Sequence, residues 1–283
     1  MRLEDSPLHH PAGGPPPRPG EDTEIAYAKI NLALHVRARR ADGFHDLETV
    51  FAFVDAGDEL RIAPADGDSL TLTGEFGTIL ADGDNIVAQA LSRLPHGPGW
   101  AVSLDKRLPV AAGLGGGSAD AGAVFRLVER LHGLPDGWQA LAAALGADVP
   151  ACVHSRAMLG HGTGTHLHAV ANDLARTPVL LVNPRVPLPT GPVFRGWDGI
   201  DRGPLPSGDL RTIAREGRND LEPGAIALVP QIADVLDWLH RSGAWLVRMS
   251  GSGATCFALY DTVEQRDAAK VPEGWWHLAG TLR

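Results

Sequence analysis

A glycine-rich stretch near the middle of the chain constrains the fold more than any other sequence feature. Glycine occupies four of the five positions 113–117, and apolar residues then recur at helical spacing from Val124 to Leu131. Such a loop leaves its backbone N–H groups uncovered, and the following helix, which Ser118 is placed to cap, adds the positive end of its dipole. The pattern predicts a loop that binds an anionic phosphate group; a flexible or closely packed turn is the alternative.

Two common nucleotide-binding motifs are excluded at this loop. No Gly-Lys-Ser/Thr sequence follows the glycines, so the loop is not a Walker A motif. Ser118 stands where a dinucleotide-binding fingerprint that begins at Gly113 needs a glycine or an alanine. A Rossmann oxidoreductase is therefore disfavoured.

A strand that carries a lysine is predicted at residues 24–36. Apolar residues alternate along one face, while Lys29 and Asn31 fall two residues apart on the other. The chain has only three lysines beside 22 arginines, so each lysine is of interest. Lys29 either lies on a solvated sheet edge or faces a polar partner, because a charge in so apolar a stretch needs one or the other.

Asp148 precedes Val149 and Pro150 in a pattern that is typical of a helix N-cap. A second interpretation pairs it with Lys29. A lysine beside an aspartate keeps the carboxylate ionised and can stabilise an alkoxide that forms next to it. The spacing along the chain does not show whether the two residues meet.

Strands and helices interleave in both halves of the chain, which predicts an α+β or α/β protein. We expect a disordered Pro/Gly-rich tail at residues 1–22, a first domain at 23–165 that contains the glycine loop, and a second domain at 166–283. A Pro- and Gly-rich stretch at 183–208 is expected to be a long loop. Further strands are predicted at 47–53, 60–63, 70–73, 101–104, 178–182 and 256–260, and helices at 85–94, 118–131, 136–145, 210–216 and 230–242.

Composition and charge exclude several classes of protein. The 25 basic residues against 34 acidic ones give a formal charge of −9, which argues against a nucleic acid partner. No apolar run reaches the length of a membrane helix, and the two cysteines cannot form a disulfide framework. No signal or transit peptide is recognised, so we expect a cytoplasmic protein. The nearby residues His161, His166 and His168 lack a carboxylate or cysteine that would complete a metal site.

Several motifs, taken in order, resemble those of the GHMP kinase superfamily. They are Ala28-Lys29-Ile30-Asn31-Leu32, the turn at 41–45, the loop at 109–120, the segment at 146–150 and the second glycine loop at 250–254. The resemblance extends from Ile25 to the C-terminus. The loop alone indicates the superfamily, whereas the first two motifs indicate a member with a cytidine diphosphate-linked polyol as substrate.

This resemblance implies an α+β architecture with a ribosomal-S5-like N-terminal domain and a ferredoxin-like C-terminal domain. It implies transfer of the γ-phosphoryl group of ATP, with Mg²⁺, to the 2-hydroxyl of 4-diphosphocytidyl-2-C-methyl-D-erythritol. By the same resemblance, Asp148 would be the general base and Lys29 its partner. The residues implied for ATP are Pro109, Gly113, Leu114, Gly115, Gly116, Gly117, Ser118 and Ala119, and those for the substrate are Asn31, Phe44, His45 and Phe194.

The chain departs from the family pattern at two places within the resemblance. Phe44 stands where the family usually has tyrosine, which keeps ring stacking but loses a hydroxyl, and the sequence at 162–165 lacks the usual glutamate. Another GHMP kinase, acting on homoserine, mevalonate or a sugar, is one alternative, and a non-catalytic binding protein of this fold is another. A monomer and a homodimer both remain open.

Overall fold

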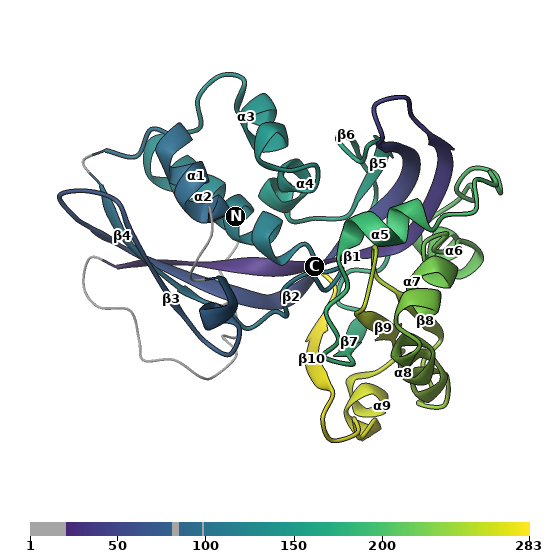
Figure 1. The fold of residues 1–283 in the computed structure, drawn as a ribbon. Coiled ribbons are helices and arrows are strands. Elements are labelled where there is room, and N and C mark those ends of the chain that lie inside the picture. Colours follow the sequence, from purple (N-terminus) through teal and green to yellow (C-terminus); the bar gives the residue numbers. More distant parts are fainter. Residues whose placement is uncertain (1–20, 81–84, 98) are drawn as a thin grey trace, which may run out of the picture.

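The computed structural model describes residues 21–80, 85–97 and 99–283, and it contains two β-sheets with helices packed against each (Figure 1). The α+β prediction is confirmed. The predicted tail lies outside the described residues up to residue 20, and the first strand begins at Asp22. No helix in the described ranges is long and apolar enough to cross a membrane.

The first sheet has six strands and is built around one long antiparallel pair. β1 (Asp22–Arg39) pairs with β2 (His45–Pro64) along nearly its whole length, with irregularities in register near Lys29, Ala33 and Ala38. The prediction of two separate strands at 47–53 and 60–63 is wrong, because β2 continues through Gly57. A Cβ atom at Gly57 would lie 1.9 Å from the Ala26 carbonyl oxygen, so glycine lets the two strands approach there. The other strands are β3 (Ser69–Thr73), β4 (Trp100–Asp105), β5 (Met158–Gly162) and β6 (His166–Ala169).

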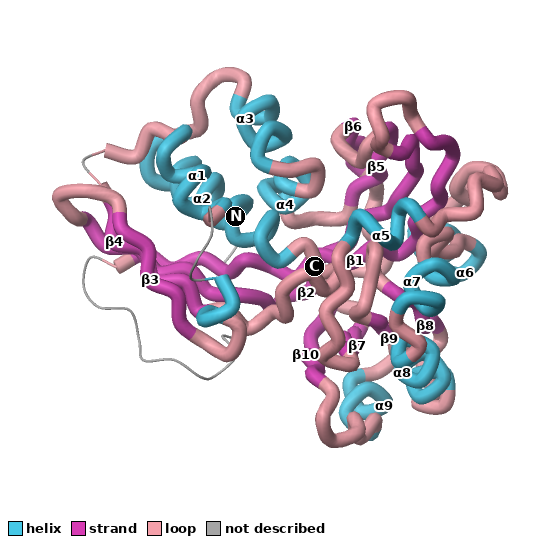
Figure 2. Tube along the Cα trace, in the orientation of Figure 1, coloured by secondary structure: helices cyan, strands magenta, loops and turns pink. Residues whose placement is uncertain are grey.

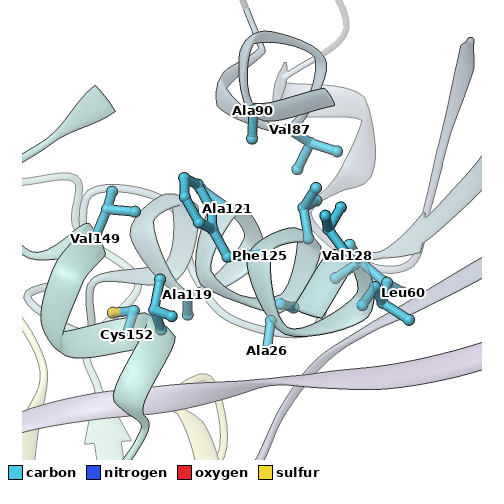
Figure 3. Close-up of a cluster of buried hydrophobic side chains, with 14 of the residues drawn as sticks. Ala26, Leu60, Val87, Ala90, Ala119, Ala121, Phe125, Val128, Val149 and Cys152 are labelled. Atoms are coloured by element: carbon cyan, nitrogen blue, oxygen red, sulfur yellow. The ribbon is translucent and has the colours of Figure 1, made fainter. Parts of the chain in front are cut away.

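Four helices cover one face of this sheet, as Figure 2 shows in cyan. They are α1 (Ile86–Arg93), α2 (Gly116–His132), α3 (Trp138–Leu145) and α4 (Val149–His154). The buried side of α2 carries Phe125 and Val128, which pack in one cluster with Leu60 and Ala26 of the sheet (Figure 3). Ser118 does not cap α2, because the helix already begins at Gly116 and its N-cap is Gly115 in the left-handed conformation.

The second sheet has the strand order β10-β7-β9-β8 and is fully antiparallel. Its strands are β7 (Pro178–Asn183), β8 (Leu246–Met249), β9 (Cys256–Leu259) and β10 (Trp276–Thr281). The predicted long loop at 183–208 contains a short helix, α5 (Thr190–Arg195), which Gly191 and Pro192 concealed. The helices α7 (Glu222–Leu228) and α9 (Val263–Ala268) were also missed, and α6 (Leu210–Glu216) and α8 (Gln231–His240) lie where helices were predicted.

The two halves contact each other along the β1–β2 pair. Leu34 of β1 forms a bridge with Asn219, and Val54 of β2 forms one with Leu282 near the C-terminus. β6 pairs with β5 inside the first sheet. We therefore propose that the first domain extends through β6, a few residues past the expected boundary at 165.

Candidate active site

A cavity of about 770 Å³ lies where the glycine loop, β1, the β1–β2 turn and α5 converge. The structure brings most of the predicted site residues to this cavity, although they come from segments far apart in the sequence. The predicted residues that line it are Lys29, Asn31, Phe44, His45, Gly113, Gly115, Gly116, Gly117, Ser118, Asp148 and Phe194.

Lys29 lies at the centre of the site and is only 4% exposed. Its Nζ atom is 3.0 Å from Oδ2 of Asp148 and donates a 2.9 Å hydrogen bond to Oδ1 of Asn31. The same ammonium lies 5.6 Å from the centre of the Phe51 ring. A solvated sheet edge is therefore the wrong explanation of this lysine, and the polar-partner interpretation is confirmed.

Asp148 occupies the N-cap position of α4, but its side chain makes no capping hydrogen bond. The carboxylate turns instead toward Lys29 and keeps a side-chain exposure of 33%. Asp148, which follows Gly146 and Ala147, therefore forms an ion pair with Lys29 instead of capping α4. A carboxylate that is paired with a lysine and open to the cavity is placed to accept a proton from a bound group.

The orientation of Asn31 is fixed by Thr49, a residue that the sequence pattern did not predict for the site. The Thr49 hydroxyl donates a 2.7 Å hydrogen bond to the Ala33 carbonyl oxygen, so it accepts the 2.7 Å bond from Nδ2 of Asn31. The amide oxygen of Asn31 must then face Lys29. The only signal in the sequence is that Thr49 interrupts an apolar alternation on a strand that pairs with β1.

The glycine loop packs closely over Lys29 and against a second glycine loop. A Cβ atom at Gly115 would lie 3.1 Å from Cε of Lys29, and one at Gly113 would lie 2.2 Å from the Ser250 carbonyl oxygen. Both glycines have positive φ, which other residues rarely adopt. The Ser250 hydroxyl donates a 2.8 Å hydrogen bond to the Gly113 carbonyl oxygen, so the second loop supports the first.

Three residues that the resemblance implied for ATP are buried beneath the loop. Of the described residues that line the cavity, none is Pro109, Leu114 or Ala119. Leu114 accepts a 3.0 Å hydrogen bond from the Lys29 backbone N–H through its carbonyl oxygen. The side chains of these three residues therefore support the loop, while its glycines and Ser118 face the cavity.

Aromatic residues gather at the end of the cavity formed by the β1–β2 turn. Phe44 is 63% exposed, whereas His45 is buried with its ring 5.1 Å from that of Phe194 and 5.7 Å from that of Trp197. Burial, with a smaller effect of Arg39, lowers the pKa of His45, so the ring is neutral near pH 7. Trp197 was missed because it lies in the stretch that was expected to be an irregular loop.

The three nearby histidines lie on neighbouring strands, His161 on β5 and His166 and His168 on β6. The rings of His161 and His168 contact each other at 5.4 Å, and the described residues contain no group of three side chains that could hold a metal ion. Thr163 and Gly164, in the turn after β5, line the cavity.

Known proteins resemble this chain in both halves. A family model described as "GHMP kinases N terminal domain" matches residues 85–156, and one described as "GHMP kinases C terminal" matches residues 203–275. A curated 4-diphosphocytidyl-2-C-methyl-D-erythritol kinase from Novosphingobium aromaticivorans is 68% identical over 92% of both chains, and one from Erythrobacter litoralis is 59% identical over 92% of this chain and 99% of its own.

Solved structures show the same similarity. A crystal structure of a 4-(cytidine 5'-diphospho)-2C-methyl-D-erythritol kinase is 34% identical, with a TM-score of 0.77, and the match covers 92% of this chain and 99% of that one. A homoserine kinase from Cytophaga hutchinsonii has a TM-score of 0.67 over 97% of both chains. At 20% identity, the homoserine kinase shows a shared fold and no more.

Proposed function

Because the chain belongs to the GHMP kinase family and, within it, to the 4-diphosphocytidyl-2-C-methyl-D-erythritol kinases, we propose that Asp148 and Lys29 carry its reaction. The protein is an ATP-dependent small-molecule kinase of the non-mevalonate route to isoprenoid precursors. It transfers the γ-phosphoryl group of ATP to the 2-hydroxyl of the cytidylyl polyol. The observation that carries the assignment of residues is the 3.0 Å ion pair between Lys29 and Asp148 in a cavity lined by a glycine loop.

The proposed step begins when Asp148 takes the proton of the substrate hydroxyl. The hydroxyl oxygen then forms a bond to the γ-phosphorus of ATP, the bond from that phosphorus to its bridging oxygen breaks, and ADP leaves. Lys29 holds the Asp148 carboxylate in place through their 3.0 Å ion pair and offsets negative charge on the attacking oxygen. Phosphoryl transfer depends mainly on position and charge neutralisation, which this arrangement supplies.

The glycine loop is the proposed site of the ATP phosphates. Its glycines line the cavity at the N-terminus of α2, where uncovered N–H groups and the helix dipole attract anions. Mg²⁺ keeps several waters and binds in kinase sites largely through the phosphates of the substrate. Ser118 lines the cavity in the first turn of α2, and its hydroxyl would hold the ion together with the ATP phosphates. The ion, when bound, would neutralise phosphate charge.

The aromatic end of the cavity is the proposed cytosine site. Phe44 is exposed at the tip of the turn, and Phe194 lies on α5 beside His45, so a flat base can be held between the two phenyl rings. The neutral His45 ring can form hydrogen bonds with a base. Homoserine, mevalonate and galactose carry no cytosine base, so a kinase for any of them does not need these aromatic residues. Their presence therefore favours the cytidylyl substrate.

The direct test is ADP release with ATP and Mg²⁺, measured in parallel with four acceptors. We expect turnover with 4-diphosphocytidyl-2-C-methyl-D-erythritol and none above background with homoserine, mevalonate or galactose. Mass spectrometry of the product should show one added phosphoryl group. Turnover with one of the other acceptors alone would contradict the proposal.

Phe194→Ala tests the cytosine site. Removal of the ring should raise KM for the cytidylyl substrate by about tenfold, which corresponds to the loss of one aromatic stacking contact. KM for ATP should change by less than about twofold, because the glycine loop is formed by other elements. Equal increases in both KM values would contradict the placement of the cytosine between Phe44 and Phe194.

A further inference from the structure

A second buried lysine, Lys106, lies below the glycine loop and is not explained by the proposed reaction. It is 2% exposed, and its ammonium donates hydrogen bonds to Oδ2 of Asp58 and, at 2.7 Å, to Oδ2 of Asp120. The side chains of both aspartates are almost fully buried. We call these three residues the Lys106 cluster.

The Lys106 cluster connects the two ends of the loop. Oδ1 of Asp58 accepts hydrogen bonds of 2.6 and 2.8 Å from the backbone N–H groups of Arg107 and Leu108, where the chain enters the loop. Asp120 lies in the first turns of α2, where the chain leaves it. Lys106 bonds to both carboxylates, so one ionic group holds the entrance and the exit of the loop at a fixed separation.

The cluster also lies directly beneath the loop backbone. A Cβ atom at Gly116 would be 3.6 Å from Nζ of Lys106 and 3.9 Å from Oδ2 of Asp58. None of the three cluster residues is among the described residues that line the cavity. The cluster therefore cannot contact a ligand in the cavity and can act only through the loop.

We propose that the Lys106 cluster is a positioning group that holds the glycine loop in its phosphate-binding conformation before ATP arrives. A loop that is already ordered loses less conformational entropy on binding, so its N–H groups bind phosphate more tightly. The inference rests on the proposed function, which assigns the loop to the ATP phosphates. It gives Asp58, Lys106 and Asp120 a specific effect on nucleotide affinity in addition to any effect on stability.

An ion pair in the second half of α2 separates this role from a general role in stability. Nε of Arg126 lies 2.8 Å from Oε1 of Glu24, and the two side chains are 14% and 13% exposed. Arg126 is on the same helix as Asp120, but its other hydrogen bonds go to Ile25, Cys152 and Ser155, away from the loop. Removal of Glu24 should affect folding without affecting the loop.

The experiment compares Asp120→Ala, Asp120→Asn and Glu24→Ala with the wild-type protein by calorimetric titration with ADP, with thermal unfolding as a check on folding. Asp120→Ala leaves Lys106 paired with Asp58, so the interior keeps a neutral pair. It should weaken ADP binding by about tenfold and raise KM for ATP in parallel, the effect of one lost charge-assisted hydrogen bond. KM for the cytidylyl substrate should stay within about twofold.

The other two variants separate an effect on the loop from an effect on stability. Asp120→Asn keeps an oxygen that accepts from Lys106, so ADP affinity should return to within about threefold of wild type. Glu24→Ala should lower Tm but leave ADP affinity unchanged. Folded Asp120→Ala with wild-type ADP affinity would overturn the inference, and so would an equal loss of affinity in Glu24→Ala.

Asp58→Asn supplies an independent variant if Asp120→Ala does not fold. An asparagine at 58 can still accept from the N–H groups of Arg107 and Leu108, but it presents an amide N–H to Lys106 and so breaks the ionic connection. The same loss of ADP affinity is expected, and unchanged affinity would overturn the inference. ADP titration needs no acceptor, so failure of this test is distinct from failure of the acceptor assay, which tests the proposed function.

Discussion

Lys29 and Lys106 are buried to nearly the same degree, at 4% and 2% exposure, yet their surroundings differ in one decisive way. The carboxylate of Asp148 beside Lys29 is one-third exposed to the cavity, whereas the two carboxylates beside Lys106 are sealed, at 0% and 2% exposure. A substrate can reach the first pair but not the second. The exposure of the partner carboxylate, more than the burial of the lysine, therefore separates the pair proposed to act on substrate from the Lys106 cluster proposed to hold the loop.

The Lys106 cluster has one more carboxylate than its single ammonium can neutralise. Oδ1 of Asp120 has no hydrogen-bond partner within the described part of the chain, and burial, opposed by Lys106 and reinforced by Asp58, raises the pKa of Asp120 well above its usual value. A protonated Asp120 still accepts from Lys106. In the Lys29–Asp148 pair, in contrast, the proposed base must be a carboxylate in order to accept a proton.

The largest expected effect comes from Lys29→Met, which removes the ammonium but keeps a similar length of apolar side chain. We expect kcat to fall by about a thousandfold, because the attacking oxygen loses its nearest positive charge. ADP affinity should remain within about threefold, since the loop is held by the Lys106 cluster. A loss of ADP affinity as large as the loss of kcat would break the distinction between the two lysines.

Thr49→Val tests how the open pair is positioned. Valine has nearly the same shape as threonine, but it cannot accept the hydrogen bond from Nδ2 of Asn31, so the amide is free to turn its oxygen away from Lys29. Loss of one such bond should lower kcat by up to about tenfold. Steady-state kinetics should show no change in KM for ATP. A kcat equal to that of the wild-type protein would contradict a role for Thr49 in positioning Asn31 and Lys29.

The smallest expected effect is a change with pH in the stability that Asp120 of the Lys106 cluster contributes. Because its pKa is raised in the folded state, Asp120 binds a proton more tightly there than in the unfolded chain. The free energy of unfolding therefore increases as the pH falls through the folded-state pKa toward the ordinary value of 3.8. Asparagine at this position does not titrate. The Tm of wild type relative to Asp120→Asn should therefore rise by a few degrees between pH 8 and pH 5.

Thermal unfolding of the two proteins across this range checks the prediction. Both contain the same other titratable groups, so their difference isolates position 120. A difference in Tm that stays constant or falls on acidification would show that Asp120 is ionised in the folded protein. The contrast drawn between the Lys106 cluster and the Lys29–Asp148 pair would then fail.

The sequence predicted those parts of the site that depend on local pattern. Period-two alternation placed Lys29 and Asn31 on one side of a strand, and the run of glycines marked the loop that we propose binds phosphate. The contact of Lys29 with Asp148 depends on how α4 packs against β1, and alternation carries no information about such packing. Thr49 was missed for the same reason, because its role arises only from the pairing of β2 with β1.

The errors in the predicted fold also have local causes. Gly57 and Asp58 look like turn residues, yet β2 continues through them because Gly57 allows close approach to β1 and Asp58 is held by Lys106. In α5, Gly191 and Pro192 have low helix propensity, which the burial of Val193 overrides. Long-range contacts thus decided the structure where local propensity indicated a turn or a loop.

The rate of phosphoryl transfer by Asp148→Asn tests the central claim most directly. Asparagine keeps the size of the side chain but cannot take a proton, so with both substrates saturating the single-turnover rate should fall by at least about a hundredfold. The fold and the affinity for ADP should persist, because the Lys106 cluster is intact. A rate close to that of the wild-type protein would contradict the assignment of Asp148 as the base that its open ion pair with Lys29 supports.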